Sequence, residues 1–142
     1  MSDVVADPVR ALESVIRRMP EALSQEQIDS LTAHHFCGGL YARELFIPAG
    51  MTVVGKQHAQ QNFFLLIQGE LILATPDGPK TVHAPFMAVT QPGDKRAVYA
   101  VTDCICLNIH PNADDEQDIA VLESRYITPV ALPAPEAKEL LE

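Results

Sequence analysis

Basic residues are scarce in this sequence. Ten lysines and arginines stand against 19 aspartates and glutamates, which gives a formal net charge of −9. Such a chain repels phosphate backbones and anionic lipid headgroups, so the composition disfavours nucleic-acid and membrane-surface partners. No apolar run approaches the roughly 20 residues of a membrane-spanning helix, and the N-terminal segment MSDVVADPVRALESVIRRM lacks the apolar core of a signal peptide. We therefore expect a protein that is made in a cytoplasm.

Cysteine is also rare, and its three copies have no framework spacing. Cys104 and Cys106 are two residues apart on a predicted strand, so both side chains face the same side. A Cys-x-Cys metal site would need further thiol or histidine ligands nearby in sequence, and none are there. We interpret these two residues and Cys37 as small apolar core residues in a reducing compartment.

The motifs of several enzyme classes are missing. The sequence has no G-x-S-x-G elbow that would present a serine nucleophile, and no glycine-rich loop that would hold phosphates. With 142 residues the chain has the usual size of one domain.

The middle of the chain consists of short apolar segments rich in β-branched and aromatic residues, separated by Gly, Pro, Asp and Asn. Several short strands at close spacing predict a β sandwich or barrel. Gly69 and the pair Asp77-Gly78 predict tight turns between strands. The predicted strands are 40–47, 51–54, 63–67, 70–74, 80–83, 85–90, 97–102 and 104–110.

The two ends of the chain have a different character. Residues 7–19 predict a helix with a one-sided apolar stripe, and a second helical turn is predicted over 24–32, capped by Ser24. Residues 116–124 predict a turn or two of helix, and the three prolines of 128–136 exclude a regular helix there. The expected organisation is a helical lead over 1–36, a barrel over 37–112, and an acidic, Pro-rich arm over 113–142. We expect one or both ends to cross onto a neighbouring subunit, because ordering an extended arm needs a contact that offsets its lost entropy.

Two segments of the strand region resemble the paired motifs of the cupin superfamily. The first is GMTVVGKQHAQQNFFLLIQG, and the second is HAPFMAVTQPGDKRAVYAV. The resemblance implies an all-β fold, a cupin-type double-stranded β-helix or jelly roll, with a short N-terminal helix. More narrowly, the phrases GLYARELFIPAG, GKQH and APFMAVTQPGDKRAVYA are similar to small cupin-type proteins encoded by tailed bacteriophages.

In cupins, four side chains of these motifs, mostly histidines, hold one transition metal inside the barrel. At the corresponding positions this sequence has Lys56, His58, Asn62 and Arg96. Lysine and arginine are cations at neutral pH and repel a metal, and asparagine is a poor ligand for the softer metals. The resemblance therefore implies a degenerate metal site, at which only His58 could bind a metal, and we expect no cofactor.

Three interpretations of this pocket stay open. Lys56, His58 and Arg96 could bind a small anionic ligand, because a guanidinium fork suits a carboxylate or a phosphate. Alternatively, the side chains satisfy one another, with His58 bonded to Asn62 or to a backbone carbonyl and Arg96 paired with a carboxylate. The carboxylates considered for Arg96 are Glu44, Glu70 and Asp94. Lastly, a metal built on His58 and unexpected ligands would support an isomerase, lyase or dioxygenase.

Other polar residues of this region receive lesser roles. Gln60 and Glu44 are secondary candidates for the pocket. Tyr41 and Arg43 share one face of a strand and serve either packing or an interface. The remaining histidines are interpreted as a loop pair, His34 and His35, and as strand-end residues with satisfied hydrogen bonds, His83 and His110.

These observations favour a non-catalytic structural or assembly protein, a component of a phage virion associated with its head, connector or tail. The expected partners are copies of the chain itself, in a homo-oligomer, or other virion proteins. A metal-dependent cupin enzyme and a barrel that binds a small anionic ligand are the alternatives.

Overall fold

The computed structural model describes residues 22–75 and 77–127, and these contain nine strands and two helices. The predicted helix over 7–19 and the Pro-rich stretch 128–136 lie outside the described residues. The elements are α2 (Gln25–Ser30), β1 (Thr32–Cys37), β2 (Leu40–Ile47), β3 (Thr52–Val54), β4 (Asn62–Gln68), β5 (Glu70–Thr75), β6 (Gly78–His83), β7 (Phe86–Thr90), β8 (Ala97–Ala100), β9 (Cys104–Pro111) and α3 (Ile119–Tyr126).

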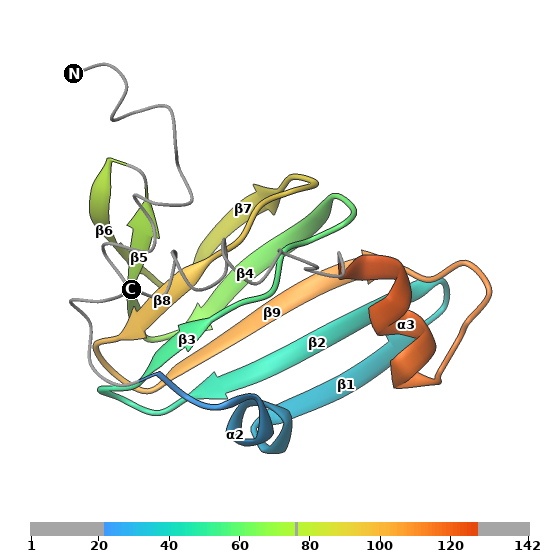
Figure 1. Ribbon diagram of the computed structural model, residues 1–142, viewed down its shortest axis with the longest axis horizontal. Coiled ribbons are helices and arrows are strands. Elements are labelled where there is room, and N and C mark those ends of the chain that lie inside the picture. Colours follow the sequence, from blue (N-terminus) through green and yellow to red (C-terminus); the bar gives the residue numbers. More distant parts are fainter. Residues whose placement is uncertain (1–21, 76, 128–142) are drawn as a thin grey trace, which may run out of the picture.

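The strands form two antiparallel sheets. The five-stranded sheet has the order β1-β2-β9-β4-β7 and the four-stranded sheet has the order β3-β8-β5-β6 (Figure 1). Neighbours in each sheet come from distant parts of the chain, as β2 pairs with β9 and β5 pairs with β8. The predicted two-sheet architecture is thereby confirmed, because alternating apolar residues can be buried only where one sheet covers the other.

The core lies between the two sheets. Leu66 on β4 and Leu71 on β5 are fully buried, one from each sheet, and Leu23 joins them from the segment before α2. The other buried members of the core are Ile47, Val53, Phe64, Leu73, Val82, Val98, Ala100, Cys104 and Cys106. Period-two alternation of inward and outward side chains places these residues on the inner faces.

All eight predicted strands are present with boundaries shifted by a few residues, but β1 was not predicted. It occupies the end of the segment assigned to the helical lead and pairs with β2 across a turn at Gly38 and Gly39. The interpretation of His34 and His35 as a loop pair is therefore wrong. The segment TAHHFC has no clear apolar alternation of its own, so its pairing with β2 determines its structure.

Gly69 makes the turn between β4 and β5 that the sequence predicts. Its φ is 95°, and a Cβ atom there would collide with the carbonyl oxygen of Asp103 and come within 2.7 Å of the sulfur of Cys104. Only glycine tolerates this backbone conformation and this close approach.

The two described helices have well-defined caps. Ser24 and Gln27 form a reciprocal capping box at α2, in which the backbone N–H of Gln27 donates to Ser24 Oγ at 3.1 Å. Asp118 caps α3, which begins and ends later than the predicted 116–124. No helix among residues 22–75 and 77–127 is long and apolar enough to cross a membrane.

The three cysteines divide between the two sides of the five-stranded sheet. Cys104 and Cys106 are buried on its inner face, as predicted. Cys37 is exposed, so its interpretation as a core residue is wrong. Cys37 lies at the end of the edge strand β1, at an outward position of the alternating pattern.

Candidate functional site

The inner face of the five-stranded sheet has a polar end. Tyr41 lies opposite His110, and Arg43 lies opposite Asn108, in the register between β2 and β9. Asn108 in turn faces Phe64 on β4. Alternation places all of these side chains toward the interior.

Backbone hydrogen bonds bring the two motif segments together beside this end. The N–H of Gly55 donates to the carbonyl of Arg96 at 2.7 Å, and the N–H of Gly93 donates to the carbonyl of His58 at 2.7 Å. The N–H of His58 donates to the carbonyl of Asp94 at 2.9 Å. Segments almost forty residues apart in sequence are thus held side by side, which is what the motif resemblance implies.

His58 and Asn62 contact each other, as one interpretation of the pocket predicts. The Asn62 amide nitrogen donates to Nδ1 of His58 at 3.2 Å and to the carbonyl of Gln60 at 3.2 Å. The Asn62 amide oxygen accepts from Nδ2 of Asn108 at 2.9 Å. Burial lowers the pKa of His58, and the positive charges of Arg96 and Arg43 lower it further. The neutral ring therefore accepts at Nδ1 and carries its proton on Nε2.

Arg96 lies in the interior but makes none of the expected ion pairs. Its Nη2 donates to Thr90 Oγ1 at 2.9 Å, and its guanidinium sits 4.6 Å from the ring centre of Phe64. Its Nε is buried without a partner in the described part of the chain. Burial lowers the pKa of Arg96, against the opposing effect of Asp94.

The carboxylates considered for Arg96 have other partners. Glu44 lies 2.9 Å from His35 on the outer side of the sheet, so it is no part of the pocket and that candidate is wrong. Glu70 lies 3.7 Å from His83, and the Asp94 carboxylate accepts from the backbone of Gln91 at 2.8 Å.

The two other proposed pocket residues differ in their placement. Lys56 is exposed but lines the cavity described below. Gln60 is exposed, and it contributes its backbone carbonyl to Asn62.

His110 is a site residue that the sequence interpretation missed. It is 1% exposed, and its Nδ1 has no hydrogen-bond partner among the described residues, so the expected satisfied hydrogen bonds are not found. Its ring stacks 4.5 Å from Tyr126, 5.9 Å from Tyr41 and 6.1 Å from His58. Burial lowers its pKa to about 4, helped by His58 and Arg43. The alternation of CICLNIHP, which puts His110 on the face of Cys104 and Cys106, was the signal that could have found it.

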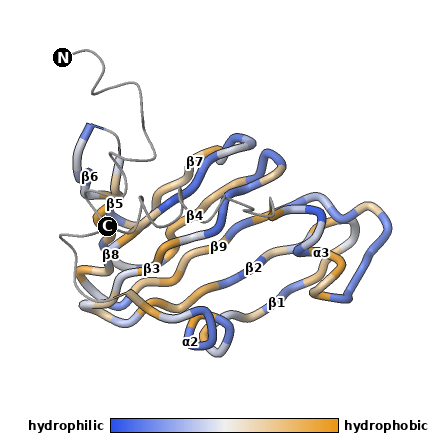
Figure 2. The backbone as a smooth tube through the Cα atoms, in the orientation of Figure 1, coloured by the Kyte–Doolittle hydropathy of each residue, from blue (hydrophilic) through white to orange (hydrophobic). Residues whose placement is uncertain are grey.

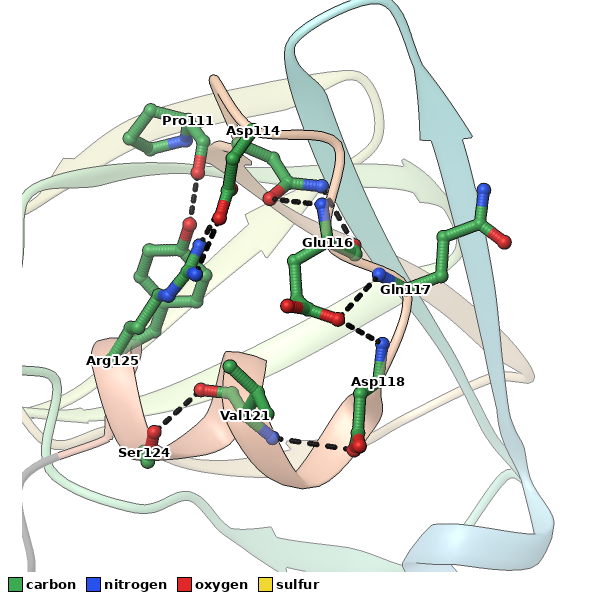
Figure 3. A network of polar contacts seen from close by, with 10 residues as sticks. Pro111, Asp114, Glu116, Gln117, Asp118, Val121, Ser124 and Arg125 are labelled. Carbon is green, nitrogen blue, oxygen red and sulfur yellow. Dashed lines mark hydrogen bonds and ion pairs between the residues drawn. The ribbon is translucent and has the colours of Figure 1, made fainter.

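Helix α3 closes this end of the barrel. Figure 3 shows the polar network that fixes it, in which Arg125 makes two bonds to the Asp114 carboxylate, at 2.8 and 2.6 Å. The hydroxyl of Tyr126 donates to the carbonyl of Pro111. On the inner side of α3, Glu123 comes within 3.4 Å of Arg43. Because Glu123 of α3 contacts Arg43, the position of this helix affects the charge at the polar end of the sheet.

A cavity of about 110 Å³ lies between these groups. Its polar lining includes Arg43, Lys56, His58, Asn108 and His110, and its apolar lining includes Ile28, Leu45, Val53, Val54 and Ile127. No aspartate or glutamate lines it within the described residues. The cavity can therefore accept hydrogen-bond acceptors and negative charge more readily than cations.

The residues at the cupin ligand positions do not fit a metal. Among the described residues, no three His, Cys, Asp or Glu side chains converge as a metal site requires. Arg96 instead brings a cation to one of the four positions, and Asn62 is bonded to His58 and Asn108. We derive no chemistry through a metal here.

Comparison with known proteins finds similarity at the level of the fold. No protein-family model matches the chain, and no curated protein matches it. Ectoine synthase from P. lautus is similar with a TM-score of 0.52 and 13% identity, over 72% of this chain and 76% of that chain. A cupin-2 domain containing protein from Shewanella frigidimarina has a TM-score of 0.47 and 16% identity, over 68% and 87%. A cupin domain from Bordetella pertussis has a TM-score of 0.46 and 17% identity, over 56% and 90%.

Sequence identities this low show a similarity of fold and give no information on function. The similarity to ectoine synthase, with its TM-score of 0.52, therefore bears on the fold and on nothing else. The expected fold class is confirmed, since the described residues form two antiparallel sheets packed around one core. The chain has the all-β cupin fold, a jelly roll with a small, half-open cavity at its polar end.

Proposed function

We propose that this protein is a non-catalytic cupin module that works by assembly, as a homo-oligomer or within a larger particle. The observation that carries the proposal is an apolar patch on the outer face of the five-stranded sheet, over β4, β7, β9 and the start of β2. Five of the seven large apolar side chains that are exposed among the described residues lie there: Leu40, Phe63, Ile67, Met87 and Val89.

The outer face is continuous across neighbouring strands. Leu40 lies on β2, Phe63 on β4 and Val89 on β7, and together with Ile109 of β9 they line a groove of about 260 Å³. In Figure 2 the hydrophobic colour covers much of β4 and part of β9 and β2, which also have hydrophilic stretches. Strands that are apolar on both faces are typical of sheets covered on both sides. We therefore infer that a partner covers this face.

Charge supports a second copy of the chain as that partner. The outward positions of β4, β9 and β7 carry no charged side chain: they are Phe63, Leu65, Ile67, Ile105, Leu107, Ile109, Pro111, Met87 and Val89. Two copies that each carry a net charge of −9 repel each other over most of their surfaces. An uncharged face allows contact without bringing like charges together, and a twofold axis would pair it with itself.

The hydrogen bonds of the pocket side chains support the part of the proposal that describes the module as non-catalytic. The side chains at the cupin ligand positions are bonded to protein groups: His58 to Asn62, and Arg96 to Thr90. In its more specific form, the proposal is that the larger particle is a phage virion. This form rests on the similarity of the segments GLYARELFIPAG, GKQH and APFMAVTQPGDKRAVYA to phage-encoded proteins. Mass spectrometry of purified particles tests it, because a structural component is present in many copies per particle.

Sedimentation velocity tests the assembly. The native protein is expected to be dimeric or larger at tens of micromolar, and the Phe63→Glu, Met87→Glu double variant is expected to dissociate with a constant raised by at least about tenfold. Val121→Glu, which introduces the same charge at an exposed apolar position of α3, is the matched control. A monomeric native protein, or a double variant that assembles as well as the control, would overturn the proposal.

The predicted arms are tested separately. Deleting residues 128–142 is expected to leave the circular dichroism of the barrel unchanged and to weaken assembly. If the truncated chain assembles like the full chain while the double variant does not, the sheet face alone carries the contact and the arms have no part in it.

A further inference from the structure

We propose that the cavity at the polar end is a binding site for a small monocarboxylate, held by Arg43 and His58. This inference is independent of the assembly proposal, because the cavity lies on the inner side of the sheet and the apolar face on its outer side. The sequence suggested Arg96 as the arginine of an anion site. In the structure Arg96 is bonded to Thr90, and Arg43 lines the cavity instead.

The size and lining of the cavity define the ligand class. A volume of about 110 Å³ corresponds to roughly three or four water molecules at their share of the liquid volume. That space suits a ligand of a few non-hydrogen atoms, such as acetate or propanoate. Leu45, Val53 and Val54 give it an apolar wall for a short aliphatic end, and the absence of acidic groups in the described lining favours a negative head.

Arg43 has donors to spare for a carboxylate. Its side chain is 19% exposed, and its contact with a charged group in the described part of the chain is one ion pair, from Nη1 to Glu123 at 3.4 Å. A guanidinium has five N–H donors, and no hydrogen bond from Arg43 to another described residue satisfies the rest. A ligand carboxylate can therefore accept from the fork in the bidentate arrangement that arginine favours.

A relay of amides orients His58 toward the same space. Asn108 donates to the oxygen of Asn62 at 2.9 Å, and the nitrogen of Asn62 donates to Nδ1 of His58 at 3.2 Å. This chain leaves Nε2 of His58 as an N–H donor on a ring that lines the cavity. The two asparagines act as positioning residues, since they set the tautomer and the orientation of the ring.

His110 forms part of the wall of the same cavity. Its side chain is 1% exposed, and its Nδ1 has neither accessible surface nor a partner among the described residues, so the ring contributes packing to the site and its Nδ1 is not a contact for the ligand. Lys56, exposed at the mouth, adds a positive charge on the entry side.

Titration of the full-length protein with propanoate, followed by calorimetry and by ¹⁵N NMR of the imidazole rings, tests the site. At neutral pH and constant ionic strength, propanoate is expected to bind saturably with a Kd on the order of 1 mM, because ligands this small bind weakly, and to shift the His58 Nε2 resonance. Arg43→Gln is expected to raise the Kd at least about tenfold. Lys80→Gln removes the same charge at an exposed position of β6 and is expected to leave the Kd unchanged.

Several results would overturn the site. These are no saturable response beyond that of an equal concentration of chloride, a response to inorganic phosphate without one to propanoate, or equal binding by Arg43→Gln and Lys80→Gln. If Arg43→Gln does not fold, His58→Phe takes its place with the same expected loss. Propanoate binding should persist in the Phe63→Glu, Met87→Glu variant, so failure of the assembly proposal and failure of the site are distinguishable.

Discussion

Along β9, the inward side chains change from Cys104 and Cys106 at one end of the barrel to Asn108 and His110 at the other. At the first end, Leu66, Leu71 and Cys104 are fully buried in the apolar core, and the Cys104 thiol also donates to the backbone carbonyls of Glu70 and Thr102. That end is stabilised by the removal of apolar surface from water.

The other end is held by hydrogen bonds and stacked rings around a cavity. Two of the three buried side-chain atoms without a partner in the described residues, Arg96 Nε and His110 Nδ1, lie there. Unsatisfied polar groups and unfilled space both cost stability. Such costs are typical of the part of a protein that carries a site, which distinguishes this end from the core.

Leu66→Ala is expected to have the largest effect, because it empties space at the closely packed end. A loss of about 2 to 5 kcal/mol in the free energy of unfolding is expected from such a cavity, measured by urea denaturation. Val121→Ala, at an exposed position of α3, is the control and should stay within about 0.5 kcal/mol. A similar loss of stability in both variants would mean that Leu66 is packed no more closely than the exposed Val121.

Acid is expected to destabilise the polar end selectively. Burial holds the pKa of His110 at about 4, below its ordinary 6.5, so the unfolded chain takes up the proton first. The contribution of neutral His110 to the free energy of unfolding is therefore complete above pH 6.5 and is lost as the pH falls toward 4. The difference between the two pKa values corresponds to about 3 kcal/mol in the free energy of unfolding. The groups that face His110 are His58, Arg43, Tyr41 and Tyr126.

His110→Phe isolates this effect, since His34 and His58 also have lowered pKa values and act in the same direction. The variant should lose less stability than the native protein between pH 6.5 and 4. The Asp114 carboxyl, whose pKa its bonds to Arg125 lower to about 2, acts only below that window. Parallel pH profiles for the two proteins would show that His110 is not the sensitive group.

Asn62→Leu is expected to cost about 1 to 3 kcal/mol, because it leaves Asn108 and His58 without their partner. Gln60→Ala is the matched control, since the exposed side chain of Gln60 is removed while its carbonyl stays. Urea denaturation of both variants measures the difference. Equal stabilities would mean that the amide relay contributes nothing to the polar end.

The smallest effect concerns thiol reactivity on the two sides of the sheet. Burial raises the pKa of Cys106 to about 12 and raises that of Cys104, whereas Cys37 is exposed. In native protein one thiol is expected to react with a disulfide reagent, and all three after denaturation. Cys37→Ser should show no native reaction, and rapid labelling of that variant would contradict the burial of the inner pair.

Local patterns explain why the strands could be predicted but β1 could not. Segments such as NFFLLIQ and CICLNIHP carry their own β-rich pattern, and Gly69, with its positive φ, ends the first of them. The segment TAHHFC becomes a strand because β2 offers it an edge to pair with. The same pairing overturned the interpretations of His34, His35 and Cys37, whose environments depend on the neighbouring strand.

Within the site, the contact between His58 and Asn62 could be predicted because they belong to one motif and are close in sequence. The position of Arg43 and His110 beside the cavity could not be predicted, since they lie on β2 and β9, far from that motif in sequence. The pairing of Arg96 with a carboxylate was wrong because opposite charges in a sequence do not show which side of a sheet each one faces.

Composition, strand pattern and two motifs by themselves determined that this chain forms an all-β jelly roll with few metal-binding side chains at the cupin positions. These properties depend on residue chemistry and on spacing within short segments. Only the tertiary structure decided that Arg43, His58, Asn108 and His110 share a cavity, that Arg96 is bonded to Thr90, and that the outer face of one sheet is apolar and exposed. Those features depend on which strands pair and in what register, and a one-residue shift of register would turn every one of these side chains to the other face.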